Sequence, residues 1–173
     1  STSYEYELLF VNDGSKDRTE SLLLSFAEQD KHVKVLSFSR NFGHQNAVTA
    51  GLQHCSGDIT VIIDADLQDP PEVIPQMIET YLREKSNVVY AVRNKREGES
   101  FGKLLTAKVY YRMLNYLSDY TFPVDTGDFR LIDRKVLDTF KRFPEKHKYL
   151  RGLFSWMGFK QTPFYYDRHA RAA

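Results

Sequence analysis

The sequence predicts an α/β protein with a mostly parallel central sheet flanked by helices. Short apolar runs alternate with amphipathic stretches of helical spacing along nearly the whole chain, and several runs end in clusters of Asp, Asn and Gly. This alternation is typical of a parallel sheet whose strands are joined by right-handed helical crossovers. Such sheets bind ligands at the carboxyl ends of their strands, so the polar clusters contain the candidate functional residues.

The composition is that of a globular domain. Of the 173 residues, 42% are hydrophobic and 14% aromatic, which is enough to form a core. The net charge of +1 argues against a nucleic-acid partner, because such proteins usually carry clustered positive charge. The single cysteine, Cys55, excludes an internal disulfide, and we interpret it as a buried apolar residue. The sequence has no apolar run of about 18 residues, the length that a membrane-spanning helix needs.

The first half of the chain is expected to form three strands, each followed by a helix. The strands are predicted from short, bulky apolar runs at residues 6–11, 33–38 and 59–63. Helical spacing of apolar residues predicts helices at residues 19–30 and 45–54, and a third that begins after Pro70 and Pro71.

The second half continues the alternation. We expect strands at residues 88–92, 129–132 and 162–166, and helices at residues 107–117, 134–142 and 148–157. A polar loop is expected at residues 95–102, and a turn at residues 125–128. No repeat or linker interrupts the pattern, so we interpret residues 1–173 as a single domain.

Two carboxylates, Asp64 and Asp66, follow the third expected strand. In an extended chain both can converge on one small site, to which Gln68 adds a neutral oxygen. Mg²⁺ and Mn²⁺ prefer oxygen ligands, and a cation carrying a diphosphate would offset the repulsion between the carboxylates. The triplet alone is also compatible with a solvated acidic turn. Phosphoaspartate hydrolases share a D-x-D after a strand, but they need Thr or Val where this chain has Gln68.

Two more polar clusters follow the first two strands. Residues 12–15, which include Asp13, could hydrogen-bond a base or ribose, or could form an ordinary turn with Asp17 capping the next helix. Residues 40–46 offer a cation, amides and the N–H groups of a helix N-terminus, which suit a nucleotide. The candidate binding residues in this second cluster are Arg40, Asn41, His44 and Asn46.

The second half supplies a candidate acid–base group and several cations. Asp128 stands between a glycine and a phenylalanine, which is consistent with a partly desolvated general base. A turn carboxylate paired with Arg130 explains the same pattern equally well. Four cations could contact phosphates, although each alone also fits a solvated surface charge: Arg93, Arg96, Lys103 and Arg151.

Five motifs, taken together and in order, resemble one family. They are VNDGSKD, SRNFGHQNAVTAGL, DADLQDPPE, TGDFRLIDR and YLRGLFSWMGF. In this order they closely resemble the polyprenyl-phosphate glycosyltransferases of the inverting GT-A class (family 2), such as bactoprenol glucosyltransferases and dolichyl-phosphate mannose synthases. The resemblance covers nearly the whole chain, and it implies the GT-A fold of nucleotide-diphospho-sugar transferases.

The resemblance also implies roles for particular residues. Asp13 would contact the base or ribose, and Asp64 would lie near the ribose and diphosphate. The cation, Mg²⁺ or Mn²⁺, would be held by Asp66 and Gln68, with Asp64 beside them. Asp128 matches the catalytic carboxylate of the family. The residues that match cations receiving the acceptor phosphate are Arg93 and Lys103.

The activity that the resemblance implies is transfer of a hexose from a nucleotide sugar, with UDP-glucose as the expected donor, to a polyprenyl phosphate at the cytoplasmic face of a membrane. Such enzymes serve the synthesis of cell-wall or envelope polysaccharides. Family members have a first strand and helix before the position of Ser1 and membrane helices after Arg171, so we expect this chain to be truncated at both ends and to reach the membrane through segments outside it. A homo-oligomer is left open.

Two alternatives remain at this point. One is transfer to a polysaccharide or protein hydroxyl, which would require a true general base. The aromatic stretch at residues 110–120 favours a lipid acceptor if it lies against a membrane, but it could equally pack in the core. The other alternative is a nucleotide-sugar-binding module without catalysis.

Overall fold

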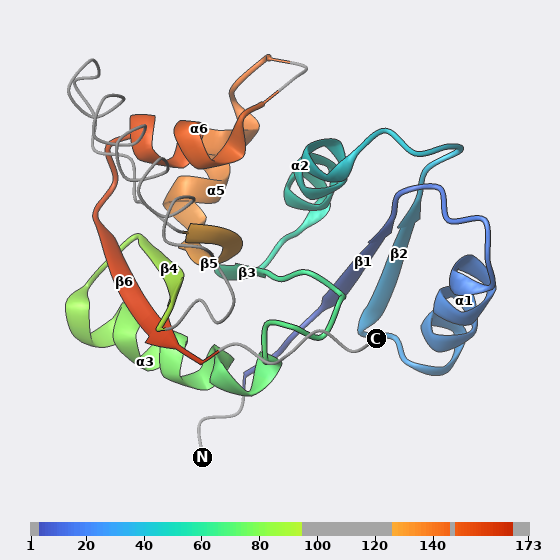
Figure 1. The fold of residues 1–173 in the computed structure, drawn as a ribbon, viewed down its shortest axis with the longest axis horizontal. Helices are drawn as coiled ribbons and strands as arrows, with labels where there is room; N and C mark the ends of the chain where they lie inside the picture. Colours follow the sequence, from blue (N-terminus) through green and yellow to red (C-terminus); the bar gives the residue numbers. More distant parts are fainter. Residues whose placement is uncertain (1–3, 95–125, 146–147, 168–173) are drawn as a thin grey trace, which may run out of the picture. The chain divides into compact units, whose positions relative to one another are not determined.

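The computed structural model describes residues 4–94, 126–145 and 148–167. The chain forms two compact units (Figure 1). Unit 1 lies within Ser1–Asp58 and Leu137–Tyr149, and unit 2 within Ile59–Val136 and Leu150–Ala173. Each unit contains a sheet and helices, which confirms the predicted α/β class. The single domain expected for residues 1–173 stays a prediction.

Unit 1 contains a two-stranded parallel sheet. Strand β1 (Leu8–Asn12) pairs with β2 (Val33–Ser37), from Leu8 opposite Val33 to Asn12 opposite Ser37. Helix α1 (Thr19–Gln29) connects the strands, and α2 (His44–His54) follows β2. Helix α1 contacts β2, and α2 contacts β1 (Figure 1). The strand–helix–strand–helix order and the parallel direction are those that the sequence predicts.

The turn after β1 lies against the chain that follows β2. The backbone N–H of Phe38 donates to Asn12 O at 2.9 Å. Within the turn, Ser15 N–H donates to Asn12 Oδ1 at 3.0 Å. The Asp17 carboxylate accepts from Thr19 N–H at 3.0 Å, but the N-cap of α1 is Arg18, so Asp17 lies one residue before the capping position that we expected it to fill. Gly14 has φ +67°, and a Cβ placed on it would lie 2.3 Å from the carbonyl carbon of Arg40. Only glycine fits this position.

The Glu7 carboxylate holds three segments of unit 1 together. Its Oε2 accepts from Lys34 Nζ at 2.6 Å, and its Oε1 accepts from the backbone N–H of Ser56 at 2.7 Å. The hydrogen bond from Lys34, followed by that from Ser56, lowers the pKa of Glu7 to about 2. The ionised carboxylate therefore links the chain before β1, strand β2 and the end of α2.

Unit 2 contains a four-stranded sheet in the order β3-β5-β4-β6. Its strands are β3 (Ile59–Ile62), β4 (Val88–Arg93), β5 (Thr126–Asp133) and β6 (Gln161–Tyr166). Strands β4 and β6 are parallel, but β5 runs antiparallel to both of its neighbours, β3 and β4. The expectation of a mostly parallel sheet is therefore wrong for β5, which enters the sheet between strands that precede it in sequence.

The helices after β3 follow the predicted positions with some changes. A 3₁₀ turn (Pro71–Val73) precedes α3 (Ile74–Glu84), which lies along β4 and β6 (Figure 1). Helix α5 (Arg134–Lys141) begins where Asp133 Oδ1 accepts from Val136 N–H at 2.9 Å. Helix α6 (Leu150–Trp156) is shorter than predicted. Helices α3 and α6 lie in unit 2, and α5 begins in unit 2 and continues into the residues of unit 1. The loop expected at residues 95–102 and the helix expected at residues 107–117 lie outside the described residues.

The turn expected at residues 125–128 is wrong where the structure describes it, because Thr126, Gly127 and Asp128 belong to β5. The pairs Thr126–Val92 and Arg130–Tyr90 on either side keep the Gly-Asp segment within this central strand, as part of an irregularity in its pairing with β4. The core beside β5 is formed by Met77, Val89, Ala91, Phe129, Leu131 and Tyr166. Cys55 is buried, as predicted. In the described part of the chain, we find no helix with the length and apolar character needed to cross a membrane.

Replacing Gly14 by alanine is expected to destabilise unit 1. The Cβ would meet backbone atoms of Arg40 and Asn41, and the left-handed backbone adds strain, so we expect a loss of about 2–4 kcal/mol in the free energy of unfolding. Urea unfolding measures this loss. Gly158→Ala is the matched control, because Gly158 has φ +71° and no atom lies within 4 Å of its added Cβ. Equal losses of unfolding free energy at the two positions would show that contact with the Arg40 backbone does not restrict position 14.

Replacing Glu7 by glutamine is expected to remove a pH-dependent stabilisation. The folded pKa of about 2 lies below the usual 4.5, so the stabilisation is present above about pH 4.5 and is lost as the pH falls toward 2. Because Lys34 is 54% exposed and screened by water, we expect a difference of only about 1 kcal/mol at pH 7. In urea unfolding, the gap between wild type and variant should narrow from about pH 4.5 downward and close only as the pH approaches 2; a gap that stays constant with pH would exclude the ionised pair. Glu5→Gln is the control.

Candidate functional site

The loop after β3 carries the two carboxylates of the D-x-D sequence. Asp64 is half-buried, Asp66 is exposed, and the Asp66 carboxylate accepts from Gln68 N–H at 3.1 Å. Leu67 has φ +59° and a side chain that is 71% exposed, so the chain turns sharply at this point. The loop thus presents Asp66 at the surface, directly beyond the carboxyl end of β3.

The oxygen ligands of this loop fit a hard divalent cation that receives its other ligands from a substrate. Among the residues that the structure describes, no three His, Cys, Asp or Glu side chains are grouped as a complete metal site. Mg²⁺ is usually bound by one or two carboxylates together with phosphate oxygens and waters. Asp64, Asp66 and Gln68 match that incomplete protein contribution, in which a diphosphate would supply the remaining oxygens.

Strand β5 has an irregularity at Asp128. On β4, Tyr90 pairs with Arg130 and Val92 pairs with Thr126, so two steps on β4 correspond to four on β5. A bulge of this kind takes residues out of the ladder and re-aims their side chains. Phe129 lies in the core, while the Asp128 side chain forms a hydrogen bond with Arg151 on α6.

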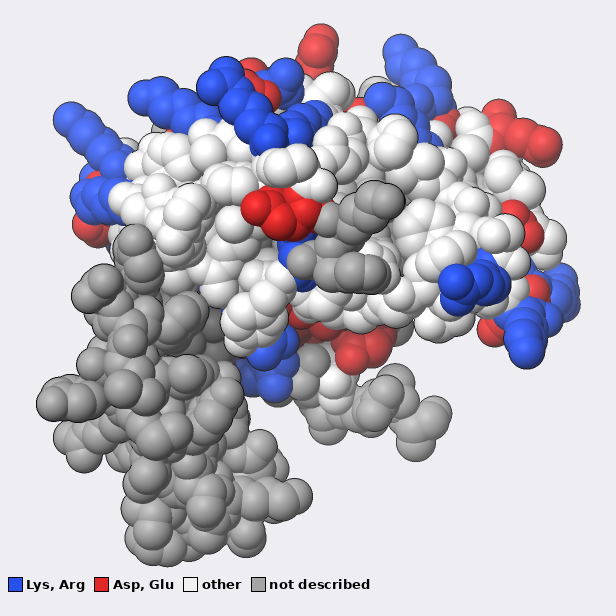
Figure 2. Space-filling view, turned by 90° about the horizontal axis from the view of Figure 1, so that it is seen from above, with Lys and Arg blue, Asp and Glu red and all other residues white. Residues whose placement is uncertain are grey.

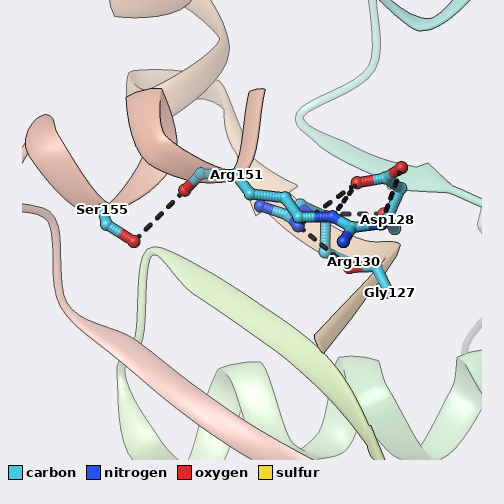
Figure 3. A network of polar contacts seen from close by, with 5 residues as sticks. All are labelled: Gly127, Asp128, Arg130, Arg151 and Ser155. Atoms are coloured by element: carbon cyan, nitrogen blue, oxygen red, sulfur yellow. Dashed lines mark hydrogen bonds and ion pairs between the residues drawn. The ribbon is translucent and has the colours of Figure 1, made fainter. Parts of the chain in front are cut away.

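Asp128 is 6% exposed and is held by two arginines (Figure 3). Arg151, on α6, donates from Nε to Oδ1 at 2.9 Å and from a terminal nitrogen to Oδ2 at 3.4 Å. Arg130, on β5, places a terminal nitrogen 3.8 Å from Oδ1. The buried carboxylate that the sequence suggests is therefore present, and Arg151 pairs with it at shorter distances than Arg130 does.

Arg130 was not selected from the sequence as a site residue, and it supports the bulge. Its guanidinium donates to Gly127 O at 3.0 Å and to Asp128 O at 3.3 Å, and it lies 4.7 Å from the ring centroid of Phe154. At 3% exposure it is a buried cation whose hydrogen bonds satisfy backbone carbonyls of the bulge. The alternation of polar and apolar residues in GDFRLID was the signal that could have identified it.

Arg93 lies at the carboxyl end of β4, in the same unit. A terminal nitrogen lies 3.4 Å from the position that a Cβ on Gly127 would occupy, so the guanidinium passes beside the bulge. Its Nε is buried and has no hydrogen-bond partner within the described part of the chain. A buried N–H group without an acceptor is unusual in proteins, so this N–H is available to donate a hydrogen bond to a bound ligand. Lys103 lies outside the described residues.

In unit 1, Asp13 and the cluster at residues 40–46 form one substructure. Both Asp13 oxygens accept backbone N–H groups, from Phe42 at 2.7 Å and from Gly43 at 2.9 Å. The Arg40 guanidinium carbon lies 4.0 Å from the Phe42 ring centroid. Asn46 donates from Nδ2 to Phe42 O at 2.6 Å. Asn41 and His44 belong to the same exposed or half-exposed segment.

This arrangement gives Asp13 a structural task that the sequence did not indicate. Its carboxylate fixes the entry to α2 by binding the N–H groups just before the first helical residue. A negative charge therefore already occupies the approach to this helix N-terminus.

On the face of the molecule drawn in Figure 2, Lys and Arg side chains are interspersed with Asp and Glu, in keeping with a net charge of +1.

A family model described as Glycosyl transferase family 2 matches residues 1–140. The chain belongs to glycosyl transferase family 2. This confirms the expected family, whose members are sugar-transferring enzymes. Family 2 proteins that are similar over almost the whole chain include one of Bacillus subtilis named uncharacterized glycosyltransferase YkcC, with 56% identity over 172 residues, covering 99% of this chain and 53% of the relative.

Two other family 2 relatives carry more specific names. The prophage bactoprenol glucosyl transferase homolog of Escherichia coli is 43% identical over 171 residues, covering 99% of this chain and 56% of the relative. The bactoprenol glucosyl transferase of Shigella phage SfV is 42% identical over 170 residues, covering 98% and 55%. The chain thus spans about half the length of the curated relatives that it matches.

Solved structures of GT-A glycosyltransferases have the same fold. The mannosyltransferase PcManGT from Pyrobaculum calidifontis, in complex with GDP-Man and Mn²⁺, aligns with a TM-score of 0.60 at 19% identity, covering 91% of this chain and 45% of that chain. TarS of S. aureus, in complex with UDP-GlcNAc, aligns with a TM-score of 0.61 at 15% identity, covering 97% and 51%. The predicted GT-A fold is confirmed.

Replacing Arg130 by methionine is expected to destabilise the family 2 domain by about 3–5 kcal/mol, because the buried Asp128 carboxylate and two backbone carbonyls lose a cationic donor. Urea unfolding measures the change. Arg83→Met is the matched control: Arg83 pairs with Glu84 at 3.0 Å on the surface and should contribute less than about 1 kcal/mol. Similar losses for both variants would show that the bulge does not depend on Arg130.

Proposed function

We propose that this chain is the catalytic domain of a metal-dependent inverting glycosyltransferase that moves a hexose from a nucleotide-diphosphate sugar to a polyprenyl phosphate. UDP-glucose is the proposed donor. The acceptor would be met at the cytoplasmic face of a membrane, through parts of the protein outside this chain. The observation that carries the proposal is the 42–43% identity, over 98–99% of the chain, to proteins named bactoprenol glucosyl transferase.

The loop after β3 is the proposed binding site for the cation and the diphosphate. Asp66 and Gln68 would hold Mg²⁺ or Mn²⁺, with Asp64 beside them toward the nucleotide. The cation, when bound, supplies positive charge that stabilises the departing nucleoside diphosphate. The exposed carboxylate of Asp66, just beyond the carboxyl end of β3, supports this assignment. PcManGT, a structure with the same fold, contains GDP-Man and Mn²⁺.

Asp128 is the proposed catalytic carboxylate, and its contacts favour an orienting role. Both of its oxygens accept hydrogen bonds from Arg151, so taking up a proton would weaken a salt bridge. A phosphate acceptor is already anionic at neutral pH and needs no proton removed before it attacks the anomeric carbon. In this proposal Asp128 and Arg151 orient the acceptor or the sugar, which raises the rate by positioning.

The cations proposed to receive the acceptor phosphate are Arg93 and Lys103. The buried, unpartnered Nε of Arg93 supports its role, because a phosphate oxygen would complete its hydrogen bonding. In unit 1, we propose that Asp13, Arg40, Asn41, His44 and Asn46 contribute to binding the nucleoside. Since Asp13 is already bonded to two N–H groups, part of its contribution would be to shape its own loop.

Replacing Asp66 by asparagine in the full natural protein is expected to lower turnover by at least about 100-fold, because the neutral amide binds a hard cation poorly. The measurement is release of UDP from UDP-glucose with polyprenyl phosphate as acceptor, as a function of Mn²⁺ concentration. Glu72→Gln, an exposed change close by in the chain, is the control and should leave turnover unchanged.

Two results of this assay would count against the proposal. Full activity of Asp66→Asn would exclude the metal assignment. Wild-type protein that binds UDP-glucose and Mn²⁺ in calorimetry, but releases no UDP with any acceptor, would favour a binding module without catalysis.

A further inference from the structure

Another buried carboxylate of unit 2, besides Asp128 and Asp133, lies at the far end of the loop after β3. Asp69 is 2% exposed and follows Gln68 directly. Pro70, the next residue, is also buried. The loop therefore has two parts. Asp66 and Leu67 form an exposed turn, and Asp69 forms a buried end from which the chain continues to α3.

Tyr166, the last residue of β6, donates a hydrogen bond from its hydroxyl to Asp69 Oδ1, across 97 residues of sequence. The tyrosine is 5% exposed, and its ring packs edge-on against Phe129 with a centroid distance of 5.6 Å. Burial, together with the bond to Asp69, raises the pKa of Tyr166 to about 12. The hydroxyl therefore keeps its proton at neutral pH and acts as the donor in this bond.

The backbone around Tyr166 is fixed independently of the loop. Tyr166 pairs in register with Arg93 on the parallel strand β4, and Asn94 N–H donates to Tyr166 O at 3.0 Å. Its ring belongs to the core beside α3. The sheet and core are thus the rigid side of the Tyr166–Asp69 contact, and the loop is the side that the contact holds in place.

We propose that Tyr166 is a positioning residue for the loop of residues 64–68: through Asp69, it fixes the loop so that Asp64, Asp66 and Gln68 can bind a divalent cation together with a nucleoside diphosphate. This inference rests on the proposed function. Neither the motifs nor the comparisons assign a role to Tyr166 or to its contact with Asp69.

The physical reason is the cost of ordering a loop when it binds. The turn at Leu67 is exposed, with a positive φ, and Asp66 is exposed beside it, whereas Asp69 is buried. A hydrogen bond at the buried end restricts the loop before the ligand arrives, and restriction in the bound geometry increases affinity. Removing a group that is hydrogen-bonded directly to a metal ligand commonly changes metal affinity by about 10–100-fold. Tyr166 acts one residue further away, through Asp69 beside Gln68, so we expect an effect at the low end of that range.

The contact is tested by Tyr166→Phe, which removes only the hydroxyl and keeps the ring in the core. Binding of Mn²⁺ is measured by electron paramagnetic resonance titration of the full natural protein in the presence of UDP. We expect about tenfold weaker Mn²⁺ binding in the variant. The matched control is Tyr165→Phe, one residue earlier, whose side chain is 62% exposed. It should bind Mn²⁺ as the wild type does.

A second pair of variants separates positioning from general destabilisation. Asp69→Asn keeps an oxygen that can accept from Tyr166, so it should weaken Mn²⁺ binding less than Asp69→Ala does. The double variant Tyr166→Phe with Asp69→Ala should bind Mn²⁺ as tightly as Asp69→Ala alone, because both changes remove the same hydrogen bond. Urea unfolding, carried out in parallel, identifies the variants that are folded at the assay temperature.

Each outcome bears on a different claim. Unchanged Mn²⁺ binding in a folded Tyr166→Phe variant, with normal binding by the wild type, would overturn this inference and leave the proposed function standing. A wild-type protein that binds no Mn²⁺ in the presence of any nucleoside diphosphate would instead overturn the proposed function, and with it the role of Tyr166. Equal weakening by Tyr166→Phe and Tyr165→Phe would also contradict the inference.

Discussion

The polar centre of unit 2 depends on pairing a buried carboxylate with two guanidinium groups. Asp128 cannot be buried as an isolated charge without a large cost, so Arg151 and Arg130 must lie where they do. Arg130 also satisfies the carbonyl groups that the bulge in β5 removes from the ladder, and Phe154 covers its guanidinium. The ion pairs and the bulge therefore stabilise each other, and together they determine the direction of the Asp128 side chain.

Local sequence pattern predicted the elements well and their arrangement less well. The strands at β1, β2 and β3 were predictable because each is a short apolar run that ends in polar residues. The antiparallel course of β5 was not, because the direction of a strand in a sheet is decided by distant partners rather than by its own residues. Similarly, the Gly-Asp of β5 resembles a turn locally and lies within a strand because the residues on either side of it, Thr126 and Arg130, pair with β4.

The candidate site shows the same division. Asp66 and Asp128 were identifiable from their neighbours in sequence, since one follows an apolar strand and the other stands between glycine and phenylalanine. Arg130 and Tyr166 were not, because their roles are contacts with backbone carbonyls and with a carboxylate 97 residues away. Residues that hold a site in shape depend on tertiary contacts, and the chemistry-bearing residues are easier to recognise because their types are limited.

The central claim, transfer to a lipid phosphate without a strong general base, is tested most directly by comparing two acceptors that differ only in the phosphate. The full natural protein, with labelled UDP-glucose and Mn²⁺, is incubated with polyprenyl phosphate or with the corresponding polyprenol, and lipid-linked label is measured. The account predicts labelled product with the phosphate alone. Comparable product with the free alcohol, or with a soluble glycan, would contradict it, because those hydroxyl acceptors need a base that the salt-bridged Asp128 is not arranged to provide.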